Sequence, residues 1–67
     1  MEITVNNQSL TLDESLSLTQ LLSAVLHISE TGIAIAVNQV VVSKSQWADY
    51  TIQPADRIVL IKATQGG

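Results

Sequence analysis

Cysteine is absent from this sequence of 67 residues, which excludes disulfide bonds, thiolate metal sites and a cysteine nucleophile. Only three residues are basic, and the net charge is −3. Because nucleic-acid binding requires a basic stripe, we expect no nucleic-acid partner. The N-terminal segment lacks the basic and apolar parts of a signal peptide, and no apolar run reaches the roughly 18 residues of a membrane span. We therefore expect a cytoplasmic protein without membrane contact.

Charged residues are also scarce. They make up 13% of the chain, against roughly 25% in an average soluble domain. A chain of this length forms one domain with a small core, and with so few charges it is expected to leave apolar surface uncovered. The sequence has no phosphate loop, no Ser/His/Asp set and no zinc-ligand spacing, so we predict no catalytic residue and no metal site.

The sequence predicts two β-hairpins and a final strand. Apolar residues alternate in pairs of short segments, with turns at Asn6-Asn7 and Asn38-Gln39 between the members of each pair. Pro54 begins a further turn before an apolar segment rich in β-branched residues. The predicted strands are 2–6, 8–12, 33–37, 40–43 and 57–63, and 44–50 is predicted as a loop or single helical turn.

Between the hairpins, the apolar period changes to that of a helix over about 18–27. Ser17 and Gln20 have the spacing of a capping box, and Leu16 can pack on Leu21 as a hydrophobic staple. The resulting order, strand–strand–helix–strand–strand–strand, predicts an α+β fold. We expect a mixed sheet of four to five strands with the helix packed on one face.

Side chains of alternating parity on these strands point to opposite faces of the sheet. We assign to the helix-covered face Ile3, Val5, Leu10, Leu12, Ile58 and Leu60. Val59 and Ile61 have the opposite parity, and no further element remains to cover them. We predict that these two residues form a partner-docking surface. The alternative is that the loop around Trp47 folds over them.

The sequence ends on Gly66 and Gly67, which are two of its three glycines. Chain ends are often small and flexible, so composition alone leaves a mobile end without function as an alternative. The functional interpretation is that a main-chain carboxylate enters the narrow site of another enzyme, because residues without a Cβ adopt conformations closed to others. An extended tail over 64–67 reaches roughly 13 Å, enough to place Gly67 in a pocket while the domain docks outside.

These features resemble the ThiS family, the sulfur carrier proteins of thiamine biosynthesis, within the ubiquitin-like β-grasp superfamily. The resemblance is carried by AIAVNQVVVSKSQW at 34–47, by the turn with Asp56 before IVLIKA, and by Gly66-Gly67. The family often has glycine where this chain has Ala55. The resemblance implies a β-grasp domain over 1–63, with a mixed five-stranded sheet, and a flexible tail over 64–67.

The resemblance also implies a carrier and not an enzyme. A ThiF-type, E1-like adenylyltransferase would use ATP and Mg²⁺ to convert the Gly67 carboxylate to an acyl-adenylate, while this chain itself would bind no cofactor. Sulfur from a cysteine desulfurase route would then leave a thiocarboxylate on Gly67 for a ThiG-type thiazole synthase. Gly66, Gln65 and Thr64 would form the tail that enters the partners' active sites. Two alternatives stay open: a carrier like the small subunit of molybdopterin synthase, and a ubiquitin-like protein modifier or interaction domain.

Four other residues or pairs have non-catalytic interpretations. His27, the only histidine, falls near the predicted helix C-terminus, where a protonated ring would be favourable. Asp13-Glu14 are adjacent acids that we interpret as solvated loop residues. Trp47 is expected to anchor its loop in the core, and Asp56 to cap a turn amide.

Overall fold

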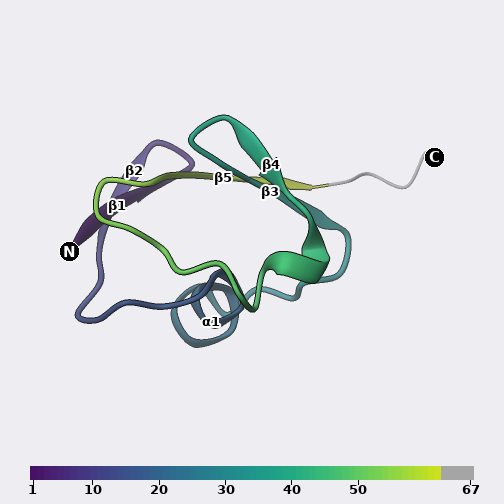
Figure 1. The fold of residues 1–67 in the computed structure, drawn as a ribbon, viewed down its shortest axis with the longest axis horizontal. Coiled ribbons are helices and arrows are strands. Elements are labelled where there is room, and N and C mark those ends of the chain that lie inside the picture. Colours follow the sequence, from purple (N-terminus) through teal and green to yellow (C-terminus); the bar gives the residue numbers. More distant parts are fainter. Residues whose placement is uncertain (63–67) are drawn as a thin grey trace.

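The structure is a computed structural model and describes residues 1–62. Its strands form one mixed sheet in the order β2-β1-β5-β3-β4, in which β1 and β5 are parallel and the other neighbours antiparallel. The sheet, with the helical segment of residues 18–26 packed on one face, confirms the predicted β-grasp fold (Figure 1). The predicted end of the last strand at 63 lies outside the described residues. The strands are β1 (Glu2–Val5), β2 (Gln8–Thr11), β3 (Ile33–Val37), β4 (Val40–Val42) and β5 (Arg57–Lys62).

Both predicted hairpin turns are confirmed. Asn6 and Asn7 have φ of 50° and 67°, and Asn38 and Gln39 have φ of 51° and 72°. Positive φ at both central residues is the geometry of a type I′ turn, whose twist matches that of the flanking strands. Asparagine tolerates this region better than other residues with a Cβ. The turn chemistry therefore fixes the register of both hairpins, with Val5 opposite Gln8 and Val37 opposite Val40.

The helix begins where the sequence predicts and then departs from α geometry. Ser17 Oγ accepts a hydrogen bond from Gln20 N at 3.1 Å, and Gln20 Oε1 accepts one from Ser17 N at 2.9 Å, so the capping box is present. However, α1 covers only Leu18–Gln20, and the continuation η1 (Leu21–Leu26) is a π-helix. The helical segment over 18–26 thus confirms the predicted helix, whereas the π geometry of its second part was not predicted, because the apolar spacing does not distinguish the two hydrogen-bond patterns. No helix within residues 1–62 has the length and hydropathy to cross a bilayer.

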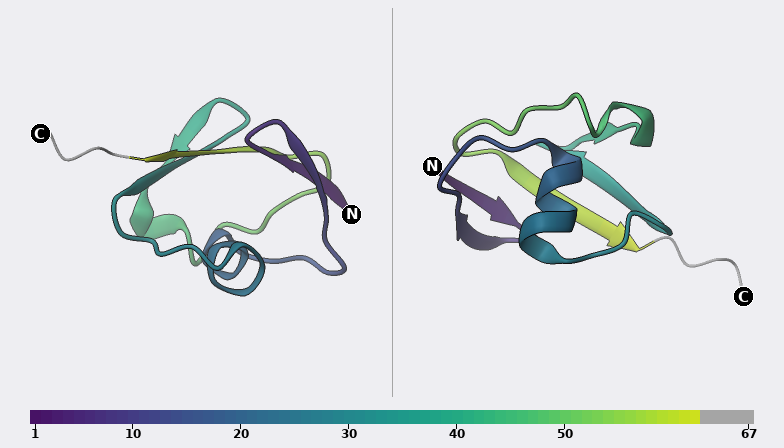
Figure 2. Two further views of the ribbon diagram at one scale, coloured as in Figure 1. Left: turned by 180° about the vertical axis from the view of Figure 1, so that it is seen from behind. Right: turned by 90° about the horizontal axis from the view of Figure 1, so that it is seen from below.

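The core lies between the helical segment and one face of the sheet, and the chain from η2 (Lys44–Gln46) to β5 closes it on the same side (Figures 1 and 2). Trp47 is 2% exposed, and its Nε1 donates a hydrogen bond to Val42 O at 2.8 Å. This confirms Trp47 as a core anchor. The residues assigned to the covered face are buried or packed against the core, and the cluster of buried residues is Ile3, Leu12, Leu18, Leu21, Leu22, Ile35, Val37, Trp47, Ile52 and Ile58.

Candidate functional site

The predicted sulfur-carrying residue, Gly67, and the predicted tail residues Gly66, Gln65 and Thr64 lie outside the described residues. Their roles, and the predicted domain boundary at 63, stay predictions. The strand that precedes them, β5, lies within the described residues. β5 is the central strand of the sheet, between β1 and β3. The chain therefore approaches the tail along a strand that pairs with β1 at its start and with β3 over 58–62.

A buried carboxylate fixes the start of β5. Asp56 is 5% exposed, and its Oδ2 accepts hydrogen bonds from Gln53 N at 2.9 Å and from the Tyr50 hydroxyl at 3.2 Å. Its Oδ1 accepts from Asn38 Nδ2 at 3.1 Å, while Asn38 Oδ1 accepts from Arg57 N at 3.0 Å. The predicted turn cap is thus confirmed, and the same carboxylate also joins the β3–β4 turn and the loop after η2 to β5.

This carboxylate affects the Tyr50 hydroxyl. Burial raises the pKa of Tyr50 above its ordinary value of 10.0, and the negative charge of Asp56 and its hydrogen bond to the hydroxyl raise that pKa further. A phenolate beside a carboxylate would bring two negative charges together and remove the donor. Tyr50 therefore keeps its proton and its hydrogen bond to Asp56 through the neutral pH range.

The predicted docking residues lie on the sheet face opposite the helical segment. Val59 is 40% exposed and Ile61 47%. The loop around Trp47 packs on the other face, so the alternative that it covers these residues is wrong. Ala36 lies between Val59 and Val41 across the strands, and Ala34 lies opposite Ile61. We call the apolar residues Ala34, Ala36, Val41, Val59 and Ile61 the outer patch.

Sequence reasoning found only the β5 part of the outer patch. Val41 is 69% exposed, and its place beside Ala36 depends on the register of the second hairpin. That register was available from the turn at Asn38-Gln39, which would have placed Val41 on the same face. The part of this sheet face formed by β1 and β2 is polar. Its side chains are those of Glu2, Thr4, Ser9 and Thr11. The docking role of the outer patch stays a prediction.

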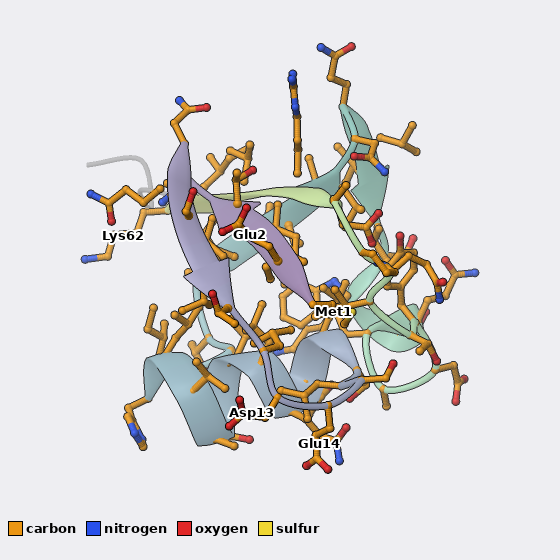
Figure 3. The ribbon with its side chains drawn as sticks, turned by 90° about the vertical axis from the view of Figure 1, so that its left-hand side faces the viewer. Met1, Glu2, Asp13, Glu14 and Lys62 are labelled. Carbon is orange, nitrogen blue, oxygen red and sulfur yellow. The ribbon has the colours of Figure 1, made fainter. Side chains whose placement is uncertain are left out.

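The remaining candidates do not assemble into a chemical site. Within residues 1–62, no group of three or more His, Cys, Asp or Glu side chains is arranged to hold a metal ion. His27 ends the helical segment with φ of 54°, and its N–H donates to Leu22 O. Asp13 and Glu14 are exposed in the loop before the helix, well apart from Lys62 at the end of β5 (Figure 3).

Comparisons with known proteins match the chain over its whole length. The family model described as ThiS family matches residues 1–67. The sulfur carrier protein ThiS of Escherichia coli (strain K12) is 33% identical over 67 residues, which cover 100% of both chains. The crystal structure of the thiamine biosynthesis protein ThiS from Geobacter metallireducens has a TM-score of 0.87 and 29% identity, with 100% of both chains covered. A solution structure of a thiamine biosynthesis protein from the same organism has a TM-score of 0.77 and 30% identity, and covers 100% of this chain and 88% of that one.

Proposed function

The chain belongs to the ThiS family, and from this premise we propose that it is a sulfur carrier protein of thiamine biosynthesis that carries sulfur on the carboxylate of Gly67. The observation that carries the proposal is the match to the family over residues 1–67, which includes Gly66 and Gly67. The absence of cysteine from the sequence is consistent with it, because no side-chain thiol could carry the sulfur instead. The names of the relatives favour thiamine over molybdopterin biosynthesis.

The chemistry begins with a carboxylate, which is a poor electrophile at neutral pH. A ThiF-type adenylyltransferase would direct a Gly67 oxygen onto the α-phosphate of ATP, and pyrophosphate would leave with its Mg²⁺. The acyl-adenylate has AMP as a good leaving group. The terminal sulfur of a persulfide from the cysteine desulfurase route would then form the C–S bond as the C–O bond to AMP breaks. A thiol reductant would cleave the S–S bond of the resulting acyl disulfide and release the thiocarboxylate. The thiocarboxylate would pass its sulfur to a ThiG-type thiazole synthase.

In this proposal the domain supplies recognition and the partners supply catalysis. The outer patch presents small and aliphatic side chains on a sheet face that carries exposed Val41, Val59 and Ile61. Apolar surface of this kind on a small domain marks a protein interaction site. Ala36 lies between Val59 and Val41, and Ala34 lies beside Ile61, and these small side chains would let a partner surface approach the sheet closely. The outer patch would therefore hold the domain while Gly67 enters the active site.

The test is ATP–pyrophosphate exchange catalysed by the ThiF-type adenylyltransferase with this chain as the co-substrate. We expect exchange with the full chain and none after deletion of Gly67, while Trp47 fluorescence shows that the domain keeps its fold. Val59→Asp and Ile61→Asp should each raise the KM for the chain by roughly tenfold, as expected for central apolar contacts. Ser9→Asp, on the polar half of the same face, is the matched control. Exchange that survives deletion of Gly67 would refute the proposal.

A further inference from the structure

The hydrogen-bond ladder between β1 and β5 ends before β5 does. Thr4 N donates to Asp56 O at 3.0 Å, and Asn6 N donates to Ile58 O at 2.9 Å. The next donor along β5, Leu60 N, donates to the side-chain Oδ1 of Asn6 at 2.8 Å and not to a backbone carbonyl. Asn6 is also the first residue of the turn that carries the chain back into β2. Its side chain therefore closes the ladder where β1 turns away.

Beyond this point β5 has backbone groups that, among the described residues 1–62, no strand faces on the β1 side. On the β3 side, Arg57 O accepts from Asn38 N at 2.8 Å, so the odd-numbered residues of β5 direct their backbone groups toward β3. The alternation of a strand then directs those of even-numbered residues toward β1. Leu60 C=O and Lys62 N–H consequently face a side where, within residues 1–62, β1 has already ended. We call Leu60–Lys62 the open edge.

A mainly apolar hollow adjoins the open edge on the helix side of the sheet. It consists of two adjacent parts of about 190 and 360 Å³ whose linings share Asn6, Ile28 and Leu60. The larger part is also lined by Ile33 and Lys62, and the smaller by Val5, Leu10 and Leu26, among others. Since one water occupies about 30 Å³, the larger part has room for an aliphatic side chain. Ile28, at its rim, is 39% exposed.

We propose that the open edge and this hollow bind an extended segment of an enzyme that acts on Gly67, by addition of a strand to β5. The segment would continue along β5 where β1 stops, pair with Leu60 C=O and Lys62 N–H, and place an aliphatic side chain in the hollow. Strand addition of this kind takes its affinity from the main chain and its specificity from alternate side-chain pockets. This inference rests on the proposed function, because it takes the enzymes of that function as the partners.

Charge defines the partner segment further. Lys62 lines the hollow, and the other lysine and the arginine lie elsewhere, Arg57 at the opposite end of β5 and Lys44 in η2. A carboxylate next to the aliphatic residue of the partner segment would meet Lys62. A second copy of this chain is a poorer occupant, because each copy carries a net charge of −3 and the two would repel. The expected occupant is therefore an acidic and aliphatic strand of the enzyme.

Amide hydrogen exchange of the ¹⁵N-labelled full chain tests this inference. We expect the Lys62 amide to exchange at least about tenfold more slowly when either the ThiF-type adenylyltransferase or the ThiG-type thiazole synthase is bound, because strand pairing protects the amide. The resonances of Leu26 and Ile28 should shift in the same complex. A complex that protects only the outer patch would overturn this inference and leave sulfur transfer to Gly67 intact. Failure of both enzymes to bind would overturn it together with the proposed docking.

Two substitutions give an independent readout of partner affinity. Ile28→Asp places a charge at the rim of the hollow and should weaken binding roughly tenfold. Lys62→Glu reverses the charge beside the partner carboxylate and should weaken binding by about threefold, the size of an exposed ion pair. The control is Val40→Asp, the same change at a valine that is 66% exposed in the second hairpin. Equal weakening by all three variants, or none by Ile28→Asp with native Trp47 fluorescence, would overturn the inference.

Discussion

Replacing Asp56 with alanine tests how the strand that leads to the tail is held. The carboxylate is 5% exposed and accepts hydrogen bonds from Asn38, Tyr50 and Gln53. Hydrogen bonds to a charged group contribute about 1.5–3 kcal/mol each. Asn38 and Gln53 are exposed, so in the variant water can accept the hydrogen bonds that their N–H groups no longer make to the carboxylate. We therefore expect Asp56→Ala to lower the free energy of unfolding by about 3 kcal/mol in total.

The assay is urea unfolding followed by Trp47 fluorescence. Trp47 is the only tryptophan and is 2% exposed, so its emission reports the loss of the core. With an m value of about 1 kcal/mol/M for a small domain, the unfolding midpoint should fall by roughly 3 M urea. A domain of this length is stable by only about 3–10 kcal/mol. The variant should thus lie close to the limit at which it folds.

The matched control is Asp49→Ala. Asp49 is exposed in the same connecting segment, and its replacement should change the free energy of unfolding by less than about 0.5 kcal/mol. Asp56→Asn keeps the shape of the side chain and should give an intermediate loss. Equal midpoints for Asp56→Ala and Asp49→Ala would refute the assignment of Asp56 as the residue that fixes the start of β5.

The remaining predictions concern the turn before β5, the hydroxyl beside Asp56 and the helix start. Ala55 has φ of 69° in the turn that Asp56 N closes on Gln53 O. Ala55→Gly should relieve about 1–2 kcal/mol of left-handed backbone strain, offset by about 0.4–1 kcal/mol for the greater entropy of the unfolded chain. We expect the free energy of unfolding in urea to rise by about 0.5–1 kcal/mol, and a less stable variant would contradict this. Folding raises the pKa of Tyr50 above 10.0, so its contribution to stability is complete below that pH and is lost as pH rises through the folded-state pKa. Because Tyr50 is the only tyrosine in the sequence, absorbance titration should show its raised pKa directly. Tyr50→Phe should not lose stability in this alkaline range, and an equal alkaline loss in both proteins would contradict the prediction. Ser17→Ala removes the capping box and should cost about 1 kcal/mol by the same unfolding assay, whereas an unchanged midpoint would mean that the cap contributes nothing.

The sequence allowed the fold to be predicted because its local signals agree with one another. Positive-φ turns at Asn6-Asn7 and Asn38-Gln39 set two hairpins, and the capping box at Ser17 set the start of the helix. Alternation along 57–62 placed Val59 and Ile61 on the face opposite the core. Each of these signals acts between residues close in sequence, so no tertiary contact was needed to interpret it.

Other features depend on contacts between distant residues and could not be predicted. Asn6 accepts a hydrogen bond from Leu60, which is 54 positions away, and this contact defines the open edge. Asp56 was expected to cap its own turn, but its bond to Asn38 spans 18 positions and requires the β3–β5 register. The π-helical turn of η1 has the same apolar spacing as an α-helix. Long-range register was therefore the missing information in the first two cases and hydrogen-bond geometry in the third.

The central claim is that Gly67 carries the sulfur. Its most direct test is intact and fragment mass spectrometry of the chain after incubation with ATP, Mg²⁺, the ThiF-type adenylyltransferase, the cysteine desulfurase with its substrate, and a thiol reductant. We predict that one oxygen is replaced by one sulfur atom and that fragmentation places this sulfur on Gly67. An unchanged mass after complete consumption of ATP, or sulfur located on any other residue, would contradict the account.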